Sequence, residues 1–264
     1  MSSRVESVID VARADGRGVL VGYLPAGFPD VQTCIEALIA LSESGVDIIE
    51  LGVPYSDPVM DGVVIQRATN AALDGGFRLA QLFEIIRGVT AKVDTPILVM
   101  TYWNPVVQYG VDRFAKDLKE AGGVGLITPD LIPDEASEWF AASDTHGLDR
   151  VFLAAPSSTD ERLVATINGS RGFVYAVSTM GITGARADVD GAARSLVDRL
   201  IGLGAKRVCV GVGISKAEHV RSVTGYASGA IVGSHLVSAL TSDGPAGVAR
   251  ATSELVAGLT ALQD

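Results

Sequence analysis

Eight short apolar, β-branched runs recur along this chain and constrain its fold more than any other feature. They are GVLVGYL (18–24), DIIELGV (47–53), PILVMTY (96–102), VGLITPD (124–130), RVFLAA (150–155), GFVYAVS (172–178), RVCVGVG (207–213) and GAIVGSH (229–235). Helix-like stretches separate most of the runs, and strand and helix alternating eight times is the pattern of a (β/α)₈ TIM barrel. A doubly wound α/β sheet would carry a GxGxxG turn after its first strand, where this chain has LPAGFPD. We therefore predict an α/β TIM barrel.

Capping residues predict where the intervening helices begin and end. The stretch 30–44 opens with Asp30 as an N-cap and ends before a glycine, and the stretch 112–121 ends at Gly122. A third helix is expected over 191–202, before the seventh run.

An additional helix is expected ahead of the barrel, at about residues 2–14. Its apolar residues Val5, Val8, Ile9 and Ala12 share one face, which suits a helix that covers one end of a barrel. No long linker or charge block divides the chain, and α/β barrels reach this length as one unit. We therefore expect a single domain over 1–264, with the barrel at about 18–260.

Composition excludes several classes of partner. No apolar run is long enough to cross a membrane, and the first residues lack the profile of a signal peptide, so we expect a cytoplasmic protein. The formal charge of −10, with no basic stretch to offset it, argues against nucleic acid. Cys34 and Cys209 have no metal-binding spacing and are interpreted as buried small hydrophobes.

Two carboxylates stand out as candidates for catalysis. Glu50 lies between Ile49 and Leu51 in a run typical of a strand buried on both faces. Burial raises the pKa of a carboxyl group and makes it a usable proton donor, although a structural ion pair is the alternative interpretation. Asp61 follows in the polar loop GVPYSDPVMDG (52–62), and two carboxylates in different environments predict two proton-transfer roles.

Further candidates lie where the apolar runs end, since barrel active sites form at the carboxyl ends of the strands. Tyr102 ends the third run, Asp130 ends the fourth, and Tyr175 lies towards the end of the sixth. The Gly-rich segments MGITGAR (180–186), GVGIS (211–215) and VGSH (232–235) follow the last three runs. Glycine lets backbone N–H groups approach an anion, so these segments predict a phosphate site.

Two kinds of carbon–carbon lyase chemistry are disfavoured. A Schiff-base aldolase needs a lysine on a strand, but the five lysines fall in helix-like or loop segments. A metal-dependent aldolase usually needs several histidines, and only His235 lies at the end of a run, where a lone His is interpreted as structural. No metal site is expected, and acid–base chemistry by carboxylates remains.

The segment IELGVPYSDPVMDGVVIQ (49–66) resembles the signature of the tryptophan synthase alpha-subunit family. YAVSTMGITGAR (175–186), GVGIS and VGSH resemble that family's phosphate-site loops in the same order, and the resemblance runs from about Gly22 to His235. It implies cleavage of indole-3-glycerol phosphate to indole and glyceraldehyde 3-phosphate with no cofactor in this chain. It also implies an αββα complex, in which the beta subunit carries pyridoxal phosphate (PLP) and receives the indole through a tunnel.

The resemblance assigns roles to individual residues. Glu50 and Asp61 match the catalytic carboxylates, and Tyr175 matches a tyrosine that lines the site. Tyr102 joins it as an expected substrate contact. The positions that match phosphate-binding ones, largely through main-chain N–H groups, are Gly184, Gly213, Gly233 and Ser234.

The chain departs from the family pattern around the phosphate. Many bacterial members have Arg-Ala where this chain has Thr179 and Met180, and many have Phe where it has Val212. These departures bear on the lid and on the fit around the phosphate. The segment 178–191 is expected to act as a lid, with an ordinary βα loop as the alternative.

Our mechanistic hypothesis gives Glu50 the protonation of indole C3, and then the removal of the C3′ hydroxyl proton. An ionised Asp61 would accept a hydrogen bond from the indole N–H. Two rivals stay open: another phosphate-binding barrel isomerase or synthase, and a non-catalytic barrel that serves only as a binding partner.

Overall fold

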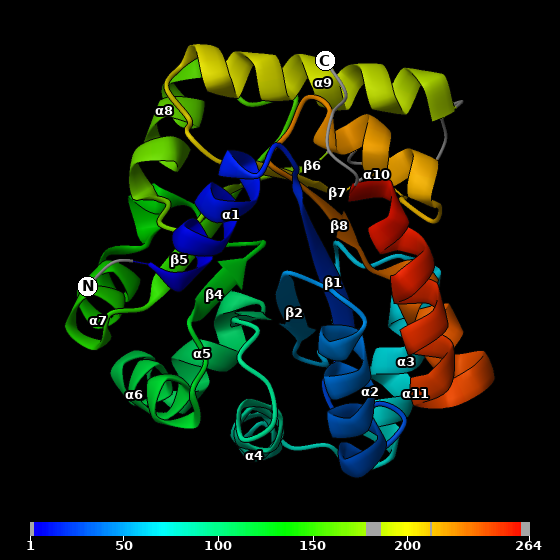
Figure 1. Ribbon diagram of the computed structural model, residues 1–264. Helices are drawn as coiled ribbons and strands as arrows, with labels where there is room; N and C mark the ends of the chain where they lie inside the picture. Colours follow the sequence, from blue (N-terminus) through cyan, green and yellow to red (C-terminus); the bar gives the residue numbers. More distant parts are fainter. Residues whose placement is uncertain (1–2, 178–185, 212, 260–264) are drawn as a thin grey trace.

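The eight apolar runs form the eight parallel strands of a closed barrel (Figure 1). The computed structural model describes residues 3–177, 186–211 and 213–259. Each strand pairs with its neighbours in chain order, and β8 closes the barrel against β1. The strands are β1 (Val19–Pro25), β2 (Ile48–Gly52), β3 (Ile97–Met100), β4 (Gly125–Thr128), β5 (Asp149–Ala154), β6 (Val174–Val177), β7 (Val208–Gly211) and β8 (Gly229–Val232). The predicted TIM barrel is confirmed.

Helices cover the outside of the barrel. They are α2 (Val31–Glu43), α3 (Val63–Asp74), α4 (Ala80–Thr90), α5 (Trp103–Tyr109), α6 (Val111–Ala121), α7 (Ser137–His146), α8 (Asp160–Gly169), α9 (Arg186–Gly202), α10 (Ala217–Thr224) and α11 (Ser234–Val256). The Asp30 side chain caps α2 by accepting from the Thr33 N–H, and Gly122 ends α6 in a left-handed conformation, as expected. The helix expected at 191–202 is longer at its start, because α9 continues through Gly191 back to Arg186.

Several strands end earlier than their apolar runs. β3 ends at Met100, and Tyr102 is the N-cap of α5. β4 ends at Thr128, two residues before Asp130, and His235 lies in the first turn of α11. The prediction that these three residues end strands was therefore wrong. The paired register between β3 and β4 ends at Met100 and Ile127, before Tyr102 and Asp130 are reached.

The barrel has two apolar layers, and together they explain why its strands read as continuous apolar runs. Leu20, Ile49 and Leu51 belong to the layer between the strands and the helices. The alternate residues of the same strands, such as Val21 and Ile48, fill the inside of the barrel. Because side chains alternate along a strand, Glu50 belongs to the inward-facing set. It lies one step above Ile48, towards the carboxyl end of the barrel.

The expected additional helix is α1 (Arg4–Ala14), and it packs against the amino-terminal end of the barrel. Val5, Ile9 and Ala12 are buried against the inner layer, and Val8 is partly buried beside them. The Ser3 hydroxyl, at the start of α1, donates a 2.6 Å hydrogen bond to Asp149 at the start of β5. This end of the barrel is thus closed by packing, which leaves the opposite end for a ligand.

The described part of the chain lacks two features that would point to particular partners. No helix there is long and apolar enough to cross a membrane. No group of three or more His, Cys, Asp or Glu side chains there is arranged to hold a metal ion.

Candidate active site

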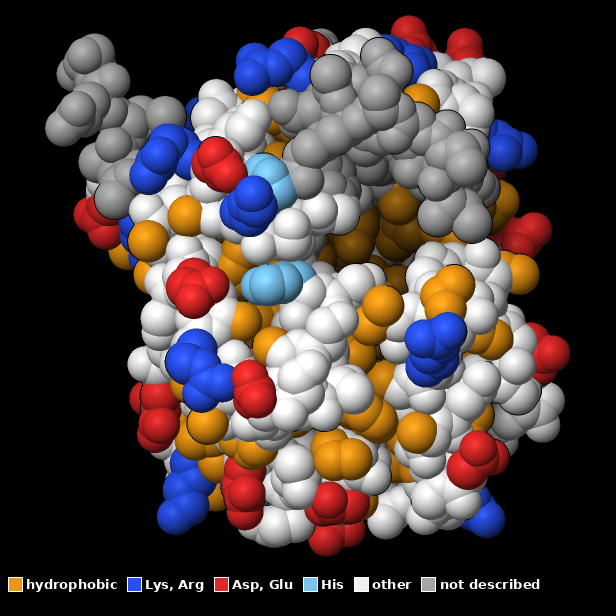
Figure 2. Space-filling view, turned by 90° about the vertical axis from the view of Figure 1, so that its right-hand side faces the viewer, with side chains coloured by type: hydrophobic (Ala, Val, Ile, Leu, Met, Phe, Trp, Pro, Cys, Tyr) orange, Lys and Arg blue, Asp and Glu red, His pale blue; other side chains and the backbone are white. Residues whose placement is uncertain are grey.

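A cavity of about 340 Å³ opens at the carboxyl ends of the strands. Glu50 and Asp61 line it together with Tyr175 and residues of the loops after β7 and β8. Figure 2 shows a hollow in the molecular surface with hydrophobic side chains at its bottom. The described residues that line the cavity include no Lys or Arg. The cavity therefore joins two carboxyl groups to an otherwise largely uncharged wall.

Glu50 is buried inside the barrel, as its place in β2 predicts. Its side chain is 1% exposed, and its Oε2 atom has no hydrogen-bond partner among the described residues. Desolvation, with a smaller contribution from the nearby charge of Asp61, raises the pKa of Glu50 from 4.5 to about 8. The alternative of a structural ion pair has no support in the described residues, where no salt bridge to Glu50 forms. Glu50 is thus a carboxylic acid that keeps its proton near neutral pH.

Asp61 reaches the same cavity from the loop after β2. Burial raises its pKa as well, so the loop is less polar around this carboxyl group than its sequence suggests. Asp61 is more exposed than Glu50, and of the two it is the group that ionises first. The pair therefore favours one proton on Glu50 and one negative charge on Asp61. The two proton-transfer roles stay a prediction.

Contacts from neighbouring elements hold the Asp61 loop in place. The Tyr102 hydroxyl accepts a 2.9 Å hydrogen bond from the Met60 N–H, and the Tyr102 ring stacks on Tyr55. The Gln66 side chain donates to the Asp61 carbonyl oxygen. Tyr102 lines a small neighbouring space that also reaches Asp61, rather than the main cavity. Its predicted contact with substrate stays a prediction, but the structure gives it a clear part in positioning the loop.

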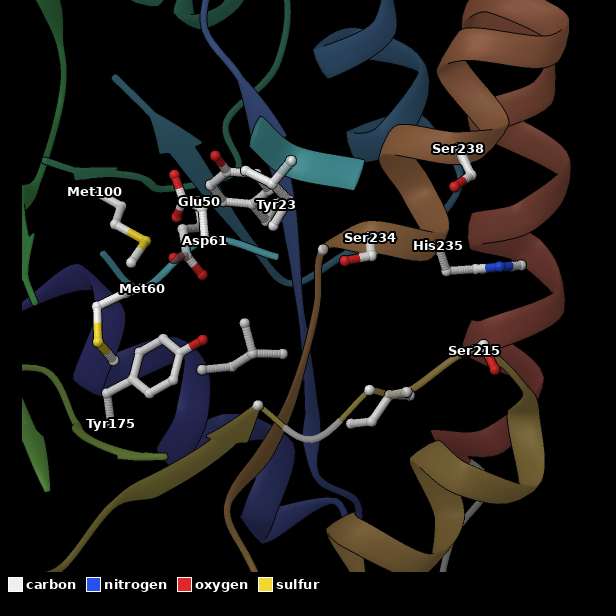
Figure 3. Close-up of a pocket in the computed structure, with 16 residues that line it drawn as sticks. Tyr23, Glu50, Met60, Asp61, Met100, Tyr175, Ser215, Ser234, His235 and Ser238 are labelled. Carbon is white, nitrogen blue, oxygen red and sulfur yellow. The ribbon is translucent and has the colours of Figure 1, made fainter. Parts of the chain in front are cut away.

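Two tyrosines, the buried Tyr23 and the half-buried Tyr175, flank the carboxyl groups (Figure 3). The Tyr175 hydroxyl points towards them from β6, and the Tyr23 ring lies on their other side, in register with Glu50. Each phenol lies directly over a glycine of the next strand, Gly211 for Tyr175 and Gly52 for Tyr23. A Cβ on Gly211 would lie 2.7 Å from the Tyr175 hydroxyl, so only glycine leaves room for this ring.

The far end of the cavity is built from the starts of two loops and a helix. Gly213 adopts a positive φ of 55°, and Gly233 precedes the first turn of α11, where Ser234 begins the helix. All three line the cavity, so the structure brings them together as predicted from the sequence. Gly184, Thr179, Met180, Val212 and most of the expected lid (178–185) lie outside the described residues.

Sequence reasoning missed the apolar and aromatic wall of the cavity. Tyr23, Met60, Ile65, Met100 and Ile231 line it, and none of them carries a chemical signal in the sequence. Tyr23 and Met100 occupy ordinary strand positions. Their inward direction could have been predicted only by assuming a barrel and applying the alternation of side chains along each strand. Asp130 was a candidate, but it lies outside this cavity and accepts a 2.9 Å hydrogen bond from the Trp103 N–H.

Comparison with known proteins shows to which family the chain belongs. The family model described as "Tryptophan synthase alpha chain" matches residues 9–262. The chain belongs to the tryptophan synthase alpha chain family. A tryptophan synthase alpha chain from Leifsonia xyli subsp. xyli is 62% identical, over 97% of this chain and 98% of that protein. One from Mycobacterium intracellulare is 54% identical, over 98% of this chain and 95% of that protein.

Solved structures agree with this assignment. A chain of Mycobacterium tuberculosis tryptophan synthase matches with a TM-score of 0.93 at 53% identity, over the whole of both chains. A chain from a study of mutual activation of the tryptophan synthase α2β2 complex of Pyrococcus furiosus matches with a TM-score of 0.83. Its identity is 37%, over 91% of this chain and 98% of that one. The protein is therefore a lyase-type catalytic subunit of tryptophan biosynthesis, and neither rival interpretation is favoured.

Proposed function

We propose that this chain cleaves indole-3-glycerol phosphate to indole and glyceraldehyde 3-phosphate, with Glu50 as the proton donor. The observation that carries the proposal is the buried Glu50 carboxyl group, with a pKa of about 8, beside the more exposed Asp61. A buried acid beside a carboxylate suits a reaction in which a neutral aromatic ring must accept a proton and then release a carbon–carbon bond.

The first step is protonation of indole C3, which turns indole into a better leaving group. Indole is a poor leaving group as a carbanion, because the negative charge would stay on carbon. Transfer of the Glu50 proton to indole C3 forms an indolenine cation, in which the positive charge lies largely on the ring nitrogen. The apolar wall of Ile65, Met100 and Ile231 lines the same cavity and suits a flat aromatic ring.

In the second step the carbon–carbon bond breaks. The Glu50 carboxylate, which has lost its proton, takes the proton of the C3′ hydroxyl group as the carbonyl forms. The electrons of the C3–C3′ bond return to the ring, which leaves as indole, and Glu50 regains the proton that it donated. Asp61 accepts a hydrogen bond from the indole N–H and stabilises the positive charge, which is greatest after protonation.

The phosphate of the substrate is assigned to the far end of the cavity. Gly213, Gly233 and Ser234 line this end, and α11 begins there with N–H groups that have no partner within the helix. We include Gly184 in this set by its place in the motif. The lid over 178–191, closing on bound phosphate, belongs to the same proposal.

The proposal is tested by single-turnover cleavage of indole-3-glycerol phosphate. Glu50→Gln keeps the size of the side chain but has no proton to give, and it is expected to lower the rate by about 10²–10⁴-fold. Asp61→Asn, which removes the negative charge opposite the ring nitrogen, is expected to lower the rate by about 10²–10³-fold. Near-wild-type cleavage by Glu50→Gln would overturn the assignment of the proton donor.

An exposed carboxylate gives the matched control for these variants. Glu84 lies on the exposed face of α4, away from the cavity, so Glu84→Gln should cleave at the wild-type rate. Circular dichroism of all three variants checks that the barrel is intact.

We further propose that the chain works with a beta subunit in an αββα complex in the cytoplasm. PLP would be held by that subunit, which would take up the released indole through a tunnel. Family membership supports a beta-subunit partner, and the Pyrococcus furiosus relative is described as part of an α2β2 complex. Pull-down of the full chain with a tryptophan synthase beta subunit tests the association directly.

A further inference from the structure

A second cavity lies at the amino-terminal ends of the strands, at the opposite end of the barrel from the substrate cavity. It measures about 730 Å³, which is enough for a molecule of metabolite size. Its walls come from α1, from the end of α9, and from the connections that lead into β1, β7 and β8 (Figure 1). We call this space among Arg13, Arg17, Lys206, Arg207 and Tyr226 the basal cavity. It shares no described lining residue with the substrate cavity.

Positive charge gathers on the wall of the basal cavity, although the whole chain carries a formal charge of −10. Four of the described lining residues are basic, namely Arg13, Arg17, Lys206 and Arg207, and Asp10 is the one acidic residue among them. The described wall of the substrate cavity, in contrast, carries two carboxyl groups and no Lys or Arg. The two ends of the barrel thus present side chains of opposite charge.

Ion pairs hold two of these basic side chains in fixed positions. Arg17 donates hydrogen bonds of 2.9 and 3.1 Å to the Asp47 carboxylate. Arg207 donates hydrogen bonds of 2.6 and 2.9 Å to Asp10 and also pairs with Glu6 at 3.0 Å. Arg17 and Arg207 therefore have a structural role, because they tie α1 and the loop before β1 to the barrel.

Arg13 and Lys206 have no such structural partner. Neither side chain makes an ion pair or a hydrogen bond to any of the described residues. Both residues are exposed and line the cavity, so a ligand can reach them. The pKa of Asp10 is lowered by its hydrogen bond with Arg207, and in addition by the charges of Arg13 and Lys206. The two cations thus lie near the same carboxyl group, on one part of the wall.

The remaining wall suits the apolar part of a small organic molecule. Ile201 is 52% exposed at the cavity, and the Tyr226 ring lines it beside the Arg194 guanidinium group, which lies 4.5 Å from the ring centroid. The loop before β1 packs directly on the end of α10, because a Cβ on Gly18 would lie only 2.5 Å from the Thr224 methyl carbon. The cavity therefore combines a cationic wall with an apolar one.

We propose that the basal cavity binds a small organic dianion, a phosphate monoester or a dicarboxylate, through Arg13 and Lys206. Each of these side chains donates a charge-assisted hydrogen bond to an oxygen of the ligand. The apolar part of the ligand lies against Ile201 and Tyr226. This site goes beyond the proposed function and does not depend on it, because none of its described residues lines the substrate cavity.

Hydrogen exchange of the full chain, measured by mass spectrometry at low ionic strength, locates the bound anion. Phenyl phosphate is the probe, because it joins a dianionic group to an apolar ring. It should protect the segments 11–18, 203–208 and 224–228, which supply the walls of the basal cavity. Protection confined to 211–215 and 232–236 would place the anion in the substrate cavity and would overturn the proposal.

A double variant tests the two cations. Arg13→Gln combined with Lys206→Gln changes exposed side chains, so the barrel should stay intact, which circular dichroism checks. The concentration of phenyl phosphate needed for half-maximal protection should rise at least about tenfold, the effect of losing one hydrogen bond to a charged group.

The matched control is Lys119→Gln combined with Arg162→Gln, which removes two exposed positive charges outside the basal cavity. It should change the half-maximal concentration by less than about twofold. Equal weakening in both double variants would show a general effect of net charge and would overturn the site.

Phthalate separates the two classes of ligand. Tighter binding of phenyl phosphate assigns the cavity to a phosphate monoester, and tighter binding of phthalate assigns it to a dicarboxylate. Absence of protection at the basal cavity with both probes would overturn the proposal. None of these measurements uses cleavage of indole-3-glycerol phosphate, so failure of the proposed function and failure of this inference are distinguishable.

Discussion

At the scale of single residues, Glu50 shows a conflict between stability and chemistry. The barrel interior removes its carboxyl group from water, and Oε2 finds no compensating partner among the described residues. A fold selected only for stability would place an apolar side chain at this position. The same desolvation keeps the proton on Glu50 near neutral pH, which is the property that an acid catalyst needs.

This conflict predicts how stability depends on pH. The pKa of Glu50 is about 8 in the folded chain, against 4.5 as its ordinary value, so the folded state holds the proton more tightly than the unfolded state. The stabilisation linked to this proton is complete below pH 4.5 and is lost as the pH rises towards 8. Glu50→Gln removes the linkage. Urea unfolding at pH 5, 7 and 9 should therefore show the variant gaining stability over the wild type as the pH rises.

The matched control for this series is again Glu84→Gln, which changes an exposed carboxylate. It should follow the wild type at every pH. A constant difference between Glu50→Gln and the wild type from pH 5 to pH 9 would show that Glu50 ionises normally in the folded chain.

Residue chemistry explains which parts of the site could be predicted from the sequence. Glu50 was detectable because a carboxylate is out of place in an apolar strand, and Asp61 because it follows in a polar loop. The raised pKa of Asp61 was not detectable, since its cause is burial by distant elements. Tyr23 and Met100 were not predicted as site residues, because an aromatic or apolar side chain in a strand is ordinary whether it faces inward or outward.

At the scale of elements, α1 closes the end of the barrel opposite the cavity. Ile9 is 1% exposed and packs into the inner layer, whereas Val11 on the same helix is 61% exposed. Ile9→Ala should lower the free energy of unfolding by about 2–5 kcal/mol, because it leaves a space that the closed barrel cannot fill. Val11→Ala should change it by less than about 0.5 kcal/mol.

Urea unfolding followed by circular dichroism measures both variants of α1. Equal effects of Ile9→Ala and Val11→Ala would show that α1 does not pack as described. KM for the substrate should stay unchanged in both, since the cavity lies at the other end of the barrel.

The ends of helices and strands are predicted less well from sequence patterns than the elements themselves. The strands were predicted because both of their faces are buried, which yields continuous apolar runs. An apolar run does not show at which residue pairing between strands stops. Tyr102 and His235 therefore lie just after their strands, at the N-cap of α5 and in the first turn of α11. Asp30 and Gly122 were reliable markers because capping and left-handed turns depend on local chemistry.

At the scale of the whole molecule, the loop that carries Asp61 faces outward as well as inward. Pro54 is buried, while Val59 and Val63 are 81% and 58% exposed. An exposed apolar side chain two residues before Asp61 suits a partner surface. Docking of a beta subunit there would fix the position of Asp61 and so couple binding to catalysis.

This coupling predicts that a beta subunit increases the rate of indole release by roughly 5–150-fold, the usual range for linked sites. Val59→Ser should reduce the increase, because it weakens docking. Val11→Ser, at the opposite end of the barrel, should not. An isolated chain that is as active as the complex would remove the need for coupling.

The claim on which all three scales depend is that Glu50 is a protonated acid at neutral pH. Difference infrared spectroscopy of the wild type against Glu50→Gln observes the C=O stretch of a protonated carboxyl group directly. The expected band is present in the wild type at pH 7, absent from the variant, and lost with a midpoint near pH 8. A band that disappears near pH 4.5 would show an ordinary glutamate that is ionised at pH 7, and Glu50 would then not be the proton donor.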